Sequence, residues 1–336
     1  MPTDISTSIV PGFDPRGHRF LVTGGAGFIG SHIVRRLVEA GAQVRVLDKF
    51  TTGRRENIDS VLDAIDLVEG DIGDMDTVRR ATAGVEYVLH LAAIVSVPET
   101  VDSPDRNFAV NLAGTHNLLL AAREAGVRRF VFSSTCAVYG DHPPPHHEEL
   151  APRALSPYGA AKAGAEQLCR SFTHVYGLPT VRLRYFNVFG PRQNTRGGYA
   201  AAIPLFITAL LDGRRPRVFG DGYQSRDFVY VANVVEANLR ACGADAAVGG
   251  VFNIGTGQQT SLRELLAILG NLLSQDVEPV FAAPRVGDIL HSYSDISRAT
   301  AALGYRPAVG LEQGLRETLA WYQEHHAVAP GGAFRV

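Results

Sequence analysis

The sequence predicts an α/β fold: a doubly wound parallel sheet with a smaller α/β substrate-binding domain beside it. The first observation is the opening unit, where residues 19–23 read as a short buried strand, 24–30 as a glycine-rich turn and 31–40 as an apolar helix. The second is that strand-like and helix-like segments alternate through the first half of the chain. Such alternation is typical of parallel sheets with helices on both faces.

Six segments have the length and apolar content of buried strands: 19–23, 43–47, 66–69, 86–91, 129–132 and 180–185. Two longer segments, about 105–125 and 158–176, have apolar positions at helical spacing. We therefore expect a Rossmann-type dinucleotide-binding domain over residues 17–186. After Asn187 the chain becomes richer in glycine and polar loops. Residues 187–327 are expected to form mainly the substrate domain, with a return segment near 226–255 that packs on the first domain.

The glycine turn predicts a dinucleotide site. Gly24, Gly27 and Gly30 permit a tight turn and a close approach of the backbone to a pyrophosphate, while the following helix offers its N-terminal donors. The second strand ends in Asp48, about 20 residues beyond the turn, where a carboxylate can bind the adenosine ribose. Asp48 favours NAD. NADP remains an alternative, because Arg54 and Arg55 could bind its 2′-phosphate.

A tyrosine and a lysine indicate proton-transfer chemistry. The chain has only two lysines against 30 arginines, and one of them, Lys162, follows Tyr158 by four residues. On a helix this spacing brings both side chains to one face. A nearby ammonium can lower the pKa of a phenol, which would make Tyr158 an acid–base group.

The bulk composition is that of a soluble enzyme. The chain of 336 residues is 46% hydrophobic and 20% charged, with a formal net charge of −2, so we expect neither nucleic-acid nor membrane partners. No signal-like or membrane-spanning run is seen, and we expect a cytoplasmic protein. The three cysteines are too far apart to suggest a metal site. The histidines of 142–147 flank three prolines, which favours a solvated loop over a metal site.

Together with the hydroxyl cluster 133–135, these motifs resemble those of the extended short-chain dehydrogenase/reductase family, over residues 18 to 325 approximately. Several stretches are similar specifically to UDP-sugar 4-epimerases: 70–72, 90–93, 132–140, 156–162, 184–190, 225–228 and 285–288. The resemblance implies Thr135, Tyr158 and Lys162 as the catalytic residues. It also implies that the helices 105–125 and 158–176 form a homodimer interface, which would explain the apolar side chains of Leu118, Leu119, Leu120 and Phe172.

The glycine turn and the resemblance together predict the residues that bind the cofactor: Gly24, Gly27, Phe28, Ile29, Gly30, Asp48, Asp71, Ile72, Leu91, Ala92, Ala93, Asn111, Ser133, Tyr158 and Lys162. The expected contacts with the UDP-sugar are Thr135, Tyr158, Asn187, Arg192, Arg226, Arg285, Asp288 and Ser292.

The reaction implied by the resemblance is NAD-dependent inversion of C4 of a UDP-hexose through a 4-keto sugar. Related 4,6-dehydratases and decarboxylases place an acid where this chain has Ala137, which favours epimerisation. A small residue at Ser292, the position expected to gate the sugar, favours UDP-N-acetylglucosamine, with UDP-glucose also admitted. UDP-glucuronate remains an alternative, because Arg192 could bind its carboxylate. A non-enzymatic NAD-binding regulator is disfavoured, because such proteins commonly lack the tyrosine and the lysine.

Overall fold

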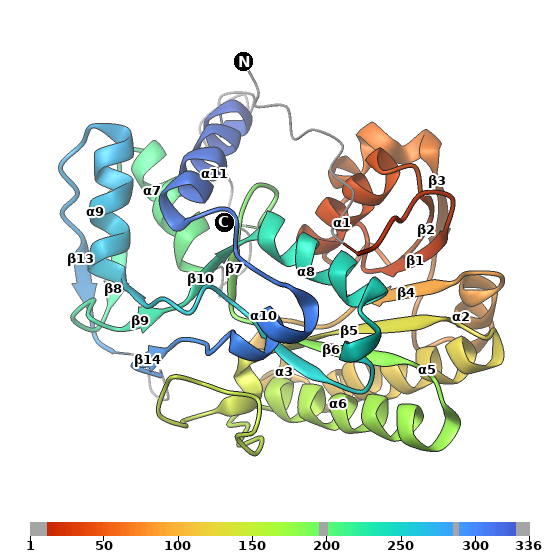
Figure 1. Cartoon of the computed structure of the whole chain (residues 1–336). Coiled ribbons are helices and arrows are strands. Elements are labelled where there is room, and N and C mark those ends of the chain that lie inside the picture. Colours follow the sequence, from red (N-terminus) through yellow and green to blue (C-terminus); the bar gives the residue numbers. More distant parts are fainter. Residues whose placement is uncertain (1–11, 195–200, 285–288, 327–336) are drawn as a thin grey trace.

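A computed structural model of the chain describes residues 12–194, 201–284 and 289–326. Its centre is a parallel sheet of seven strands in the order β11-β6-β5-β4-β1-β2-β3 (Figure 1). These strands are β1 Arg19–Thr23, β2 Gln43–Asp48, β3 Ile65–Glu69, β4 Tyr87–His90, β5 Arg129–Thr135, β6 Thr180–Tyr185 and β11 Val251–Ile254. The doubly wound α/β fold expected from the sequence is thereby confirmed. The chain reverses its direction of travel through the sheet between β1 and β4, and ligands of such sheets bind at this switch point.

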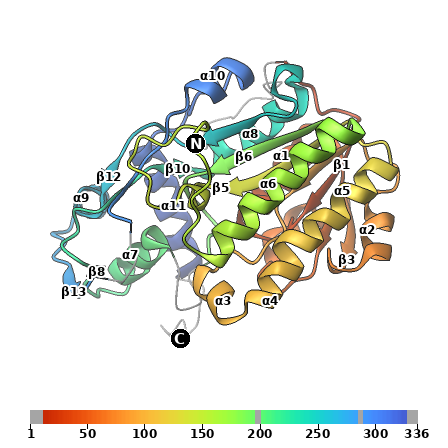
Figure 2. The same cartoon turned by 90° about the horizontal axis from the view of Figure 1, so that it is seen from below.

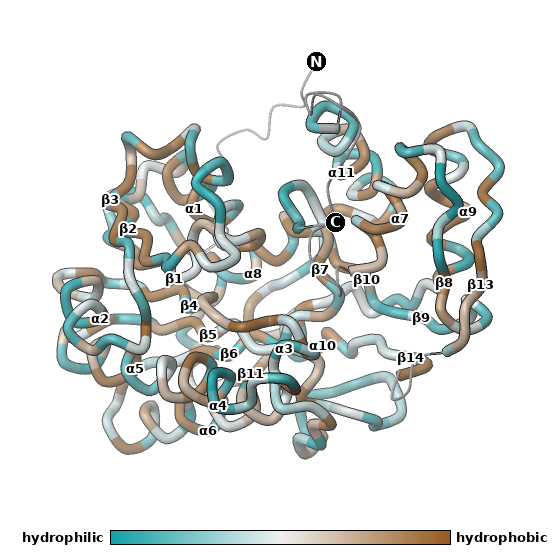
Figure 3. Tube along the Cα trace, turned by 180° about the vertical axis from the view of Figure 1, so that it is seen from behind, coloured by the Kyte–Doolittle hydropathy of each residue, from teal (hydrophilic) through white to brown (hydrophobic). Residues whose placement is uncertain are grey.

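Helices cover both faces of the sheet. Figure 1 shows α2, α5 and α6 on one face and α1 and α8 on the other. Their bounds are α1 Phe28–Glu39, α2 Met75–Thr82, α5 Thr115–Glu124, α6 Pro157–Tyr176 and α8 Val231–Gly243. Separate clusters of buried apolar side chains fill the two faces. The outer helices alternate between hydrophilic and hydrophobic residues along their length, as Figure 3 shows for α2 and α5.

The expected helix 105–125 is interrupted. The chain forms α3 Val97–Asp102 and α4 Pro104–Asn107, passes through a π-helical segment, Phe108–Gly114, and continues as α5. In the π-helical segment Asn111 turns inward and bonds both the amide and the carbonyl of Ile94. A long-range contact of this kind is invisible to helical periodicity, and π-helical segments are frequent at functional sites.

The seventh strand, β11, was not among the strands predicted from the sequence. It pairs with β6 in register Val251 to Arg182. Its place in the sheet is set by pairing with a strand about 70 residues earlier, and such a long-range pairing leaves no local pattern in the sequence.

The second half of the chain adds three small sheets beside the main one. They pair β10 with β7, β9 with β12 and β14, and β13 with β8. The strands are β7 Asn187–Phe189, β8 Arg217–Phe219, β9 Ser225–Arg226, β10 Phe228–Tyr230, β12 Thr260–Ser261, β13 Val280–Ala282 and β14 His291–Ser292. The helices are α7 Ala202–Leu211, α9 Leu262–Leu273, α10 Ser297–Leu303 and α11 Leu311–His326. A third apolar cluster packs α7, α9 and α11 against β8 and β10.

Four short 3₁₀ segments complete the described elements: Arg55–Asn57, Asp59–Ala64, Cys136–Tyr139 and Asp245–Ala247. Within the described ranges, no helix is both long enough and apolar enough to cross a membrane.

Candidate active site

One cavity of about 720 Å³ runs along the carboxyl edge of the main sheet and continues between the sheet and the second half of the chain. Its lining comes from the turn after β1, the ends of β2, β4, β5 and β6, the start of α6, and the segments around β7, α7, β8 and β9. Parallel strands place their carboxyl ends at one edge, so residues far apart in the sequence meet here.

The glycine turn forms one end of the cavity. Gly24 adopts φ +69°, and a Cβ there would lie 2.8 Å from the backbone nitrogen of Ala92. A Cβ on Gly30 would lie 2.1 Å from the carbonyl oxygen of Gly24, so only glycine lets α1 approach the strand this closely. Gly27 is the N-cap of α1 and lines the cavity. The turn has room for the diphosphate of a dinucleotide, whose oxygens would accept hydrogen bonds from the backbone amides at the N-terminus of α1.

Asp48 closes this end of the cavity at the tip of β2. Its carboxylate accepts hydrogen bonds from the amides of Ala26 (2.9 Å) and Phe50 (2.8 Å). Burial raises the pKa of Asp48, and these amide bonds oppose that rise. Because the carboxylate is held in place and lines the cavity, it fits the ribose hydroxyls of NAD.

Asp71 lies nearby after β3, where it accepts hydrogen bonds from Lys49 Nζ (2.6 Å) and the amide of Gly73 (2.9 Å). Burial is the largest single influence and would raise the pKa of Asp71, but the bonds from Lys49 and Gly73 and the charges of Lys49 and Arg106 together outweigh it and lower the pKa. The side chain is therefore ionised and its position is set by the two donors.

A buried hydroxyl–imidazole pair holds the loop after β4. Thr23 Oγ1 accepts from the amides of Leu91 and Ala92, each at 3.2 Å, and lies 2.7 Å from His90 Nδ1. Burial, followed by the charge of Lys162, lowers the pKa of His90 well below its ordinary value. His90 is therefore a neutral structural group, and the backbone of the loop is fixed where it lines the cavity.

The three predicted catalytic residues line the same cavity. Thr135 is the last residue of β5, and its hydroxyl forms a hydrogen bond with Tyr158. Lys162 lies one turn further along α6 and donates to the carbonyl oxygen of Ser133 at 2.9 Å. Ser156 caps the helix by accepting from the amide of Gly159 at 3.1 Å, which fixes the first turn that carries Tyr158.

Burial dominates the ionisation of this group. It lowers the pKa of Lys162 to about 8, while Cys169 and Glu166 oppose the shift. It raises the pKa of Tyr158 above its ordinary value, and the bond with Thr135 only partly offsets this. The lowering of the phenol pKa that the spacing suggested is therefore absent from the described side chains, because burial is the dominant influence on Tyr158.

Nearly all predicted cofactor residues belong to the cavity lining. These are Gly24, Gly27, Phe28, Ile29, Gly30, Asp48, Asp71, Ile72, Leu91, Ala92, Ala93, Ser133, Tyr158 and Lys162. Asn111 is the exception. Its buried side chain lies behind the lining, where it holds the backbone of Ile94 and bonds Asn107. It can act on a ligand only by positioning the loop after β4.

The predicted substrate residues divide into three groups. Thr135, Tyr158, Asn187 and Arg226 line the cavity. The Oδ1 atom of Asn187 is buried and receives no hydrogen bond in the described part of the chain, so it is available to a ligand donor. Arg285 and Asp288 lie outside the described residues.

Arg192 and Ser292 do not line the cavity. Arg192 has φ +66°, and burial, together with the charge of Arg35, lowers the pKa of its guanidinium. Ser292 is buried in β14, in register with Arg226 of β9. It therefore lies beside Arg226 on the neighbouring strand and is not among the residues that line the cavity, so the described residues give no support to the sugar gate expected at Ser292.

The lining also contains residues that the sequence reasoning missed. Polar or charged examples are Ser96, Glu99, Arg106, Arg217 and Gln224. Apolar examples are Phe189, Leu205, Phe206 and Phe219. The cluster of glycine and polar residues at 220–225 was a signal of a ligand loop, but no motif marked Arg217, which precedes this loop on β8.

Comparison with known proteins agrees with this architecture. The model of the NAD dependent epimerase/dehydratase family matches residues 20–255. UDP-glucose 4-epimerase of Mycolicibacterium smegmatis is 41% identical over 310 residues, covering 91% of this chain and 98% of that protein.

Two solved structures are closely similar. UDP-N-acetylglucosamine 4-epimerase from Methanobrevibacter ruminantium, in complex with UDP-N-acetylmuramic acid, has a TM-score of 0.89 and 38% identity, with 92% of this chain and 99% of that chain covered. UDP-glucose 4-epimerase from Thermotoga maritima, with UDP-glucose, has a TM-score of 0.87 and 40% identity, with 91% and 99% covered. The chain therefore belongs to the NAD dependent epimerase/dehydratase family, which confirms both the resemblance drawn from its motifs and the expectation of NAD as the cofactor.

Proposed function

We propose that the chain is a UDP-sugar 4-epimerase that inverts C4 of a UDP-hexose through a 4-keto sugar. The observation that carries the proposal is that Thr135, Tyr158 and Lys162 share one cavity with the glycine turn and with Asn187. An oxidising cofactor and a sugar bound in such a cavity would meet at the hydroxyl and phenol groups.

Each residue has a distinct part in the proposed reaction. NAD, when bound, supplies a reversible hydride acceptor for C4 of the sugar. The Tyr158 phenolate takes the proton of the 4-hydroxyl, and Thr135 holds that hydroxyl by a hydrogen bond. The ammonium of Lys162 would favour the ionised phenol during the reaction, an influence that burial outweighs in the described side chains, where the pKa of Tyr158 is raised. After the keto sugar had turned within the cavity, Tyr158 would return the proton to the oxygen, and the cofactor would supply the hydride to the opposite face of C4, so no net oxidation would occur.

The diphosphate of the UDP-sugar is assigned to the arginines of the second half of the chain. Arg217 and Arg226 both line the cavity, on β8 and β9 respectively. Guanidinium groups suit phosphate oxygens because they offer planar pairs of donors. The free Oδ1 atom of Asn187 supports an additional contact with a donor of the nucleotide sugar.

Elimination chemistry is the poorer alternative. Ala137 occupies the position where dehydratases of this family place an acid, and its amide merely donates to Thr135 Oγ1 at 3.2 Å. Burial raises the pKa of the neighbouring Cys136 thiol to about 11, so it is a poor base near neutrality. Thr135 therefore has no acid–base group at these two neighbouring positions with which to remove water from the sugar.

For the sugar, we propose UDP-N-acetylglucosamine, UDP-glucose or both. Ala201 and Ala202 give the cavity small side chains, and the similar proteins named above carry both activities in their names. UDP-glucuronate is the second candidate. It loses its main support because Arg192, the residue expected to meet a carboxylate, is not among the lining residues.

A screen for 4-epimer products from UDP-glucose, UDP-N-acetylglucosamine and UDP-glucuronate tests the proposal. We expect product from at least one of the first two sugars. Product from none of the three, with NAD bound, would refute the epimerase. A protein that binds NAD and UDP-hexoses without any transient NADH absorbance would instead be a binding regulator.

We also propose a homodimer, although through different side chains from those suggested by the sequence. Leu118, Leu119 and Phe172 are buried within their own subunit, in the core between α5, α6 and the sheet, and Leu120 is partly buried against the same core. The outward apolar residues lie on the adjoining segment and include Val101 (57% exposed) and Phe108 (60% exposed). Figure 2 shows α5 and α6 side by side on this face, with α3 and α4 at their end. A second copy packed here would cover these residues.

A further inference from the structure

Glu166 shares a face of α6 with Tyr158 and Lys162, because steps of four residues return to the same side of a helix. Unlike those two residues it does not line the cavity, and its side chain is only 1% exposed. A carboxylate this deeply buried must be paired and hydrogen-bonded. The hydrogen-bond partners of Glu166 therefore show which parts of the chain its carboxylate connects.

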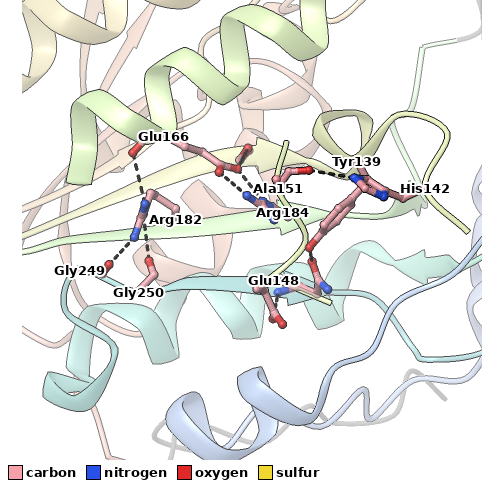
Figure 4. A network of polar contacts seen from close by, with 11 residues as sticks. Tyr139, His142, Glu148, Ala151, Glu166, Arg182, Arg184, Gly249 and Gly250 are labelled. Atoms are coloured by element: carbon pink, nitrogen blue, oxygen red, sulfur yellow. Dashed lines mark hydrogen bonds and ion pairs between the residues drawn. The ribbon is translucent and has the colours of Figure 1, made fainter. Parts of the chain in front are cut away.

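Glu166 receives hydrogen bonds from two strands. Ser134 Oγ of β5 donates to Oε1 at 2.5 Å. Arg184 of β6 donates from Nε to Oε1 at 2.9 Å and from Nη2 to Oε2 at 2.6 Å. Figure 4 shows the Glu166–Arg184 pair beneath α6. The carboxylate thus joins the helix that carries Tyr158 and Lys162 to the ends of both strands.

Ser134 is the middle residue of the segment on which the candidate catalytic groups depend. The residue before it, Ser133, accepts the hydrogen bond of Lys162 through its carbonyl oxygen. The residue after it, Thr135, bonds the phenol of Tyr158. A shift of Ser134 would move both neighbours, because they belong to the same short stretch of backbone.

Arg184 is itself fixed from the far side. Its guanidinium lies 4.7 Å from the ring centre of Tyr139, whose hydroxyl donates to Asn253 Oδ1 at 2.6 Å. Burial is the largest single influence and would lower the pKa of Arg184, but the interactions with Glu166 and Tyr139 together outweigh it and raise the pKa. Because Tyr139 holds the guanidinium of Arg184 in place, the two hydrogen bonds from Arg184 set the orientation of the Glu166 carboxylate.

We propose that Glu166 is a positioning residue that acts through Ser134 to fix the end of β5, and hence the placement of Thr135 and Lys162, with Arg184 as its anchor. The catalytic consequence rests on the proposed epimerase function. The structural consequence rests on the contacts alone.

The test compares Ser134→Ala, which removes the link to β5 and leaves the ion pair intact, with Glu166→Gln, which removes the carboxylate charge. Arg129→Met is the matched control, since Arg129 is also buried on β5 and paired, with Asp245 at 2.7 Å, but does not line the cavity. At a temperature where all variants are folded, Ser134→Ala and Glu166→Gln should lose about 10- to 100-fold in kcat. Their KM for UDP-sugar and their NAD content should change little. Arg129→Met should lose stability and keep its kcat.

Hydrogen exchange supplies a readout that does not depend on turnover. The amides of residues 135–139 should exchange faster in Ser134→Ala and Glu166→Gln than in the wild type or in Arg129→Met. Unchanged exchange there in both test variants would overturn the inference. If the wild-type chain turned over no UDP-hexose, the proposed function would fail, and exchange would still decide this inference.

Discussion

Lys162 Nζ donates a hydrogen bond to the carbonyl oxygen of Ser133 at 2.9 Å, which ties the charged side chain of α6 to the end of β5. The same strand end provides Thr135, whose hydroxyl bonds Tyr158. All three candidate groups therefore depend on one short stretch of backbone at the carboxyl edge of the sheet. Their relative placement is set by strand and helix packing, and such rigid elements hold sites more precisely than loops do.

Tyr158→Phe removes the hydroxyl that is proposed to move the proton of the sugar. We expect kcat to fall by about two to four orders of magnitude, the usual share of acid–base catalysis, with little change in UDP-sugar affinity. Steady-state kinetics with titration calorimetry measure both quantities. A variant with near-normal kcat would show that Tyr158 has no chemical role.

The stability of the protein should depend on pH through Lys162. Its pKa is about 8 in the folded chain, lowered by burial, against 10.5 for the free side chain. Between these values the unfolded chain holds a proton that the folded chain lacks, so folding becomes more favourable as pH rises from about 8 to about 10.5. The free energy of unfolding should rise by up to about 1.4 kcal/mol per pH unit relative to Lys162→Met. Urea unfolding of the wild type and of Lys162→Met across this pH range measures the difference in the free energy of unfolding. A constant difference between them would contradict the assigned pKa.

Gly30→Ala tests the cofactor cradle. The new Cβ would lie 2.1 Å from the carbonyl oxygen of Gly24, so the helix must move away from the turn. We expect loss of bound NAD and a decrease in the free energy of unfolding of about 1–3 kcal/mol or more. Gly310→Ala is the control, because no atom lies within 4 Å of a Cβ there. The NAD content of each variant is measured from the dinucleotide released on denaturation. Full NAD content in Gly30→Ala would contradict the assignment of the glycine turn as the cofactor site.

Phe108→Glu tests the proposed dimer face. A charge placed on this exposed apolar residue would be buried without a partner in the interface, so the variant should sediment as a monomer while the wild type sediments as a dimer. Val280→Glu alters another exposed apolar residue, on β13, and should remain dimeric. A wild-type chain that is monomeric at micromolar concentration would contradict the proposed homodimer.

The sequence predicted the parts of the structure whose signals are local. The glycine turn, Asp48 and the Tyr158–Lys162 spacing each combine a short motif with a recognisable strand or helix, and the cavity contains all of them. The raised pKa of Tyr158 was not predictable in this way, because burial depends on how the second half of the chain covers the site.

The second half itself was harder to predict for the same reason. Ser292 was expected to face the sugar, but β14 pairs with β9 across more than 60 residues of sequence, and Ser292 lies beside Arg226 without lining the cavity. Arg192 was expected to meet a carboxylate, yet its backbone adopts φ +66° and the side chain does not line the cavity. Neither the pairing of two-residue strands nor a single unusual dihedral angle leaves a periodic signal in the sequence.

The most direct test of the proposed chemistry is proton NMR of UDP-glucose and UDP-N-acetylglucosamine incubated with the protein in D₂O. A 4-epimerase that passes hydride from C4 to NAD and back retains the original hydrogen at C4, while only the hydroxyl exchanges with solvent. We therefore predict the 4-epimer with protium at C4 and no deuterium at C5. Solvent deuterium at C5 or loss of water from the sugar would indicate elimination, and deuterium at C4 would exclude internal hydride return. Either result would contradict the account.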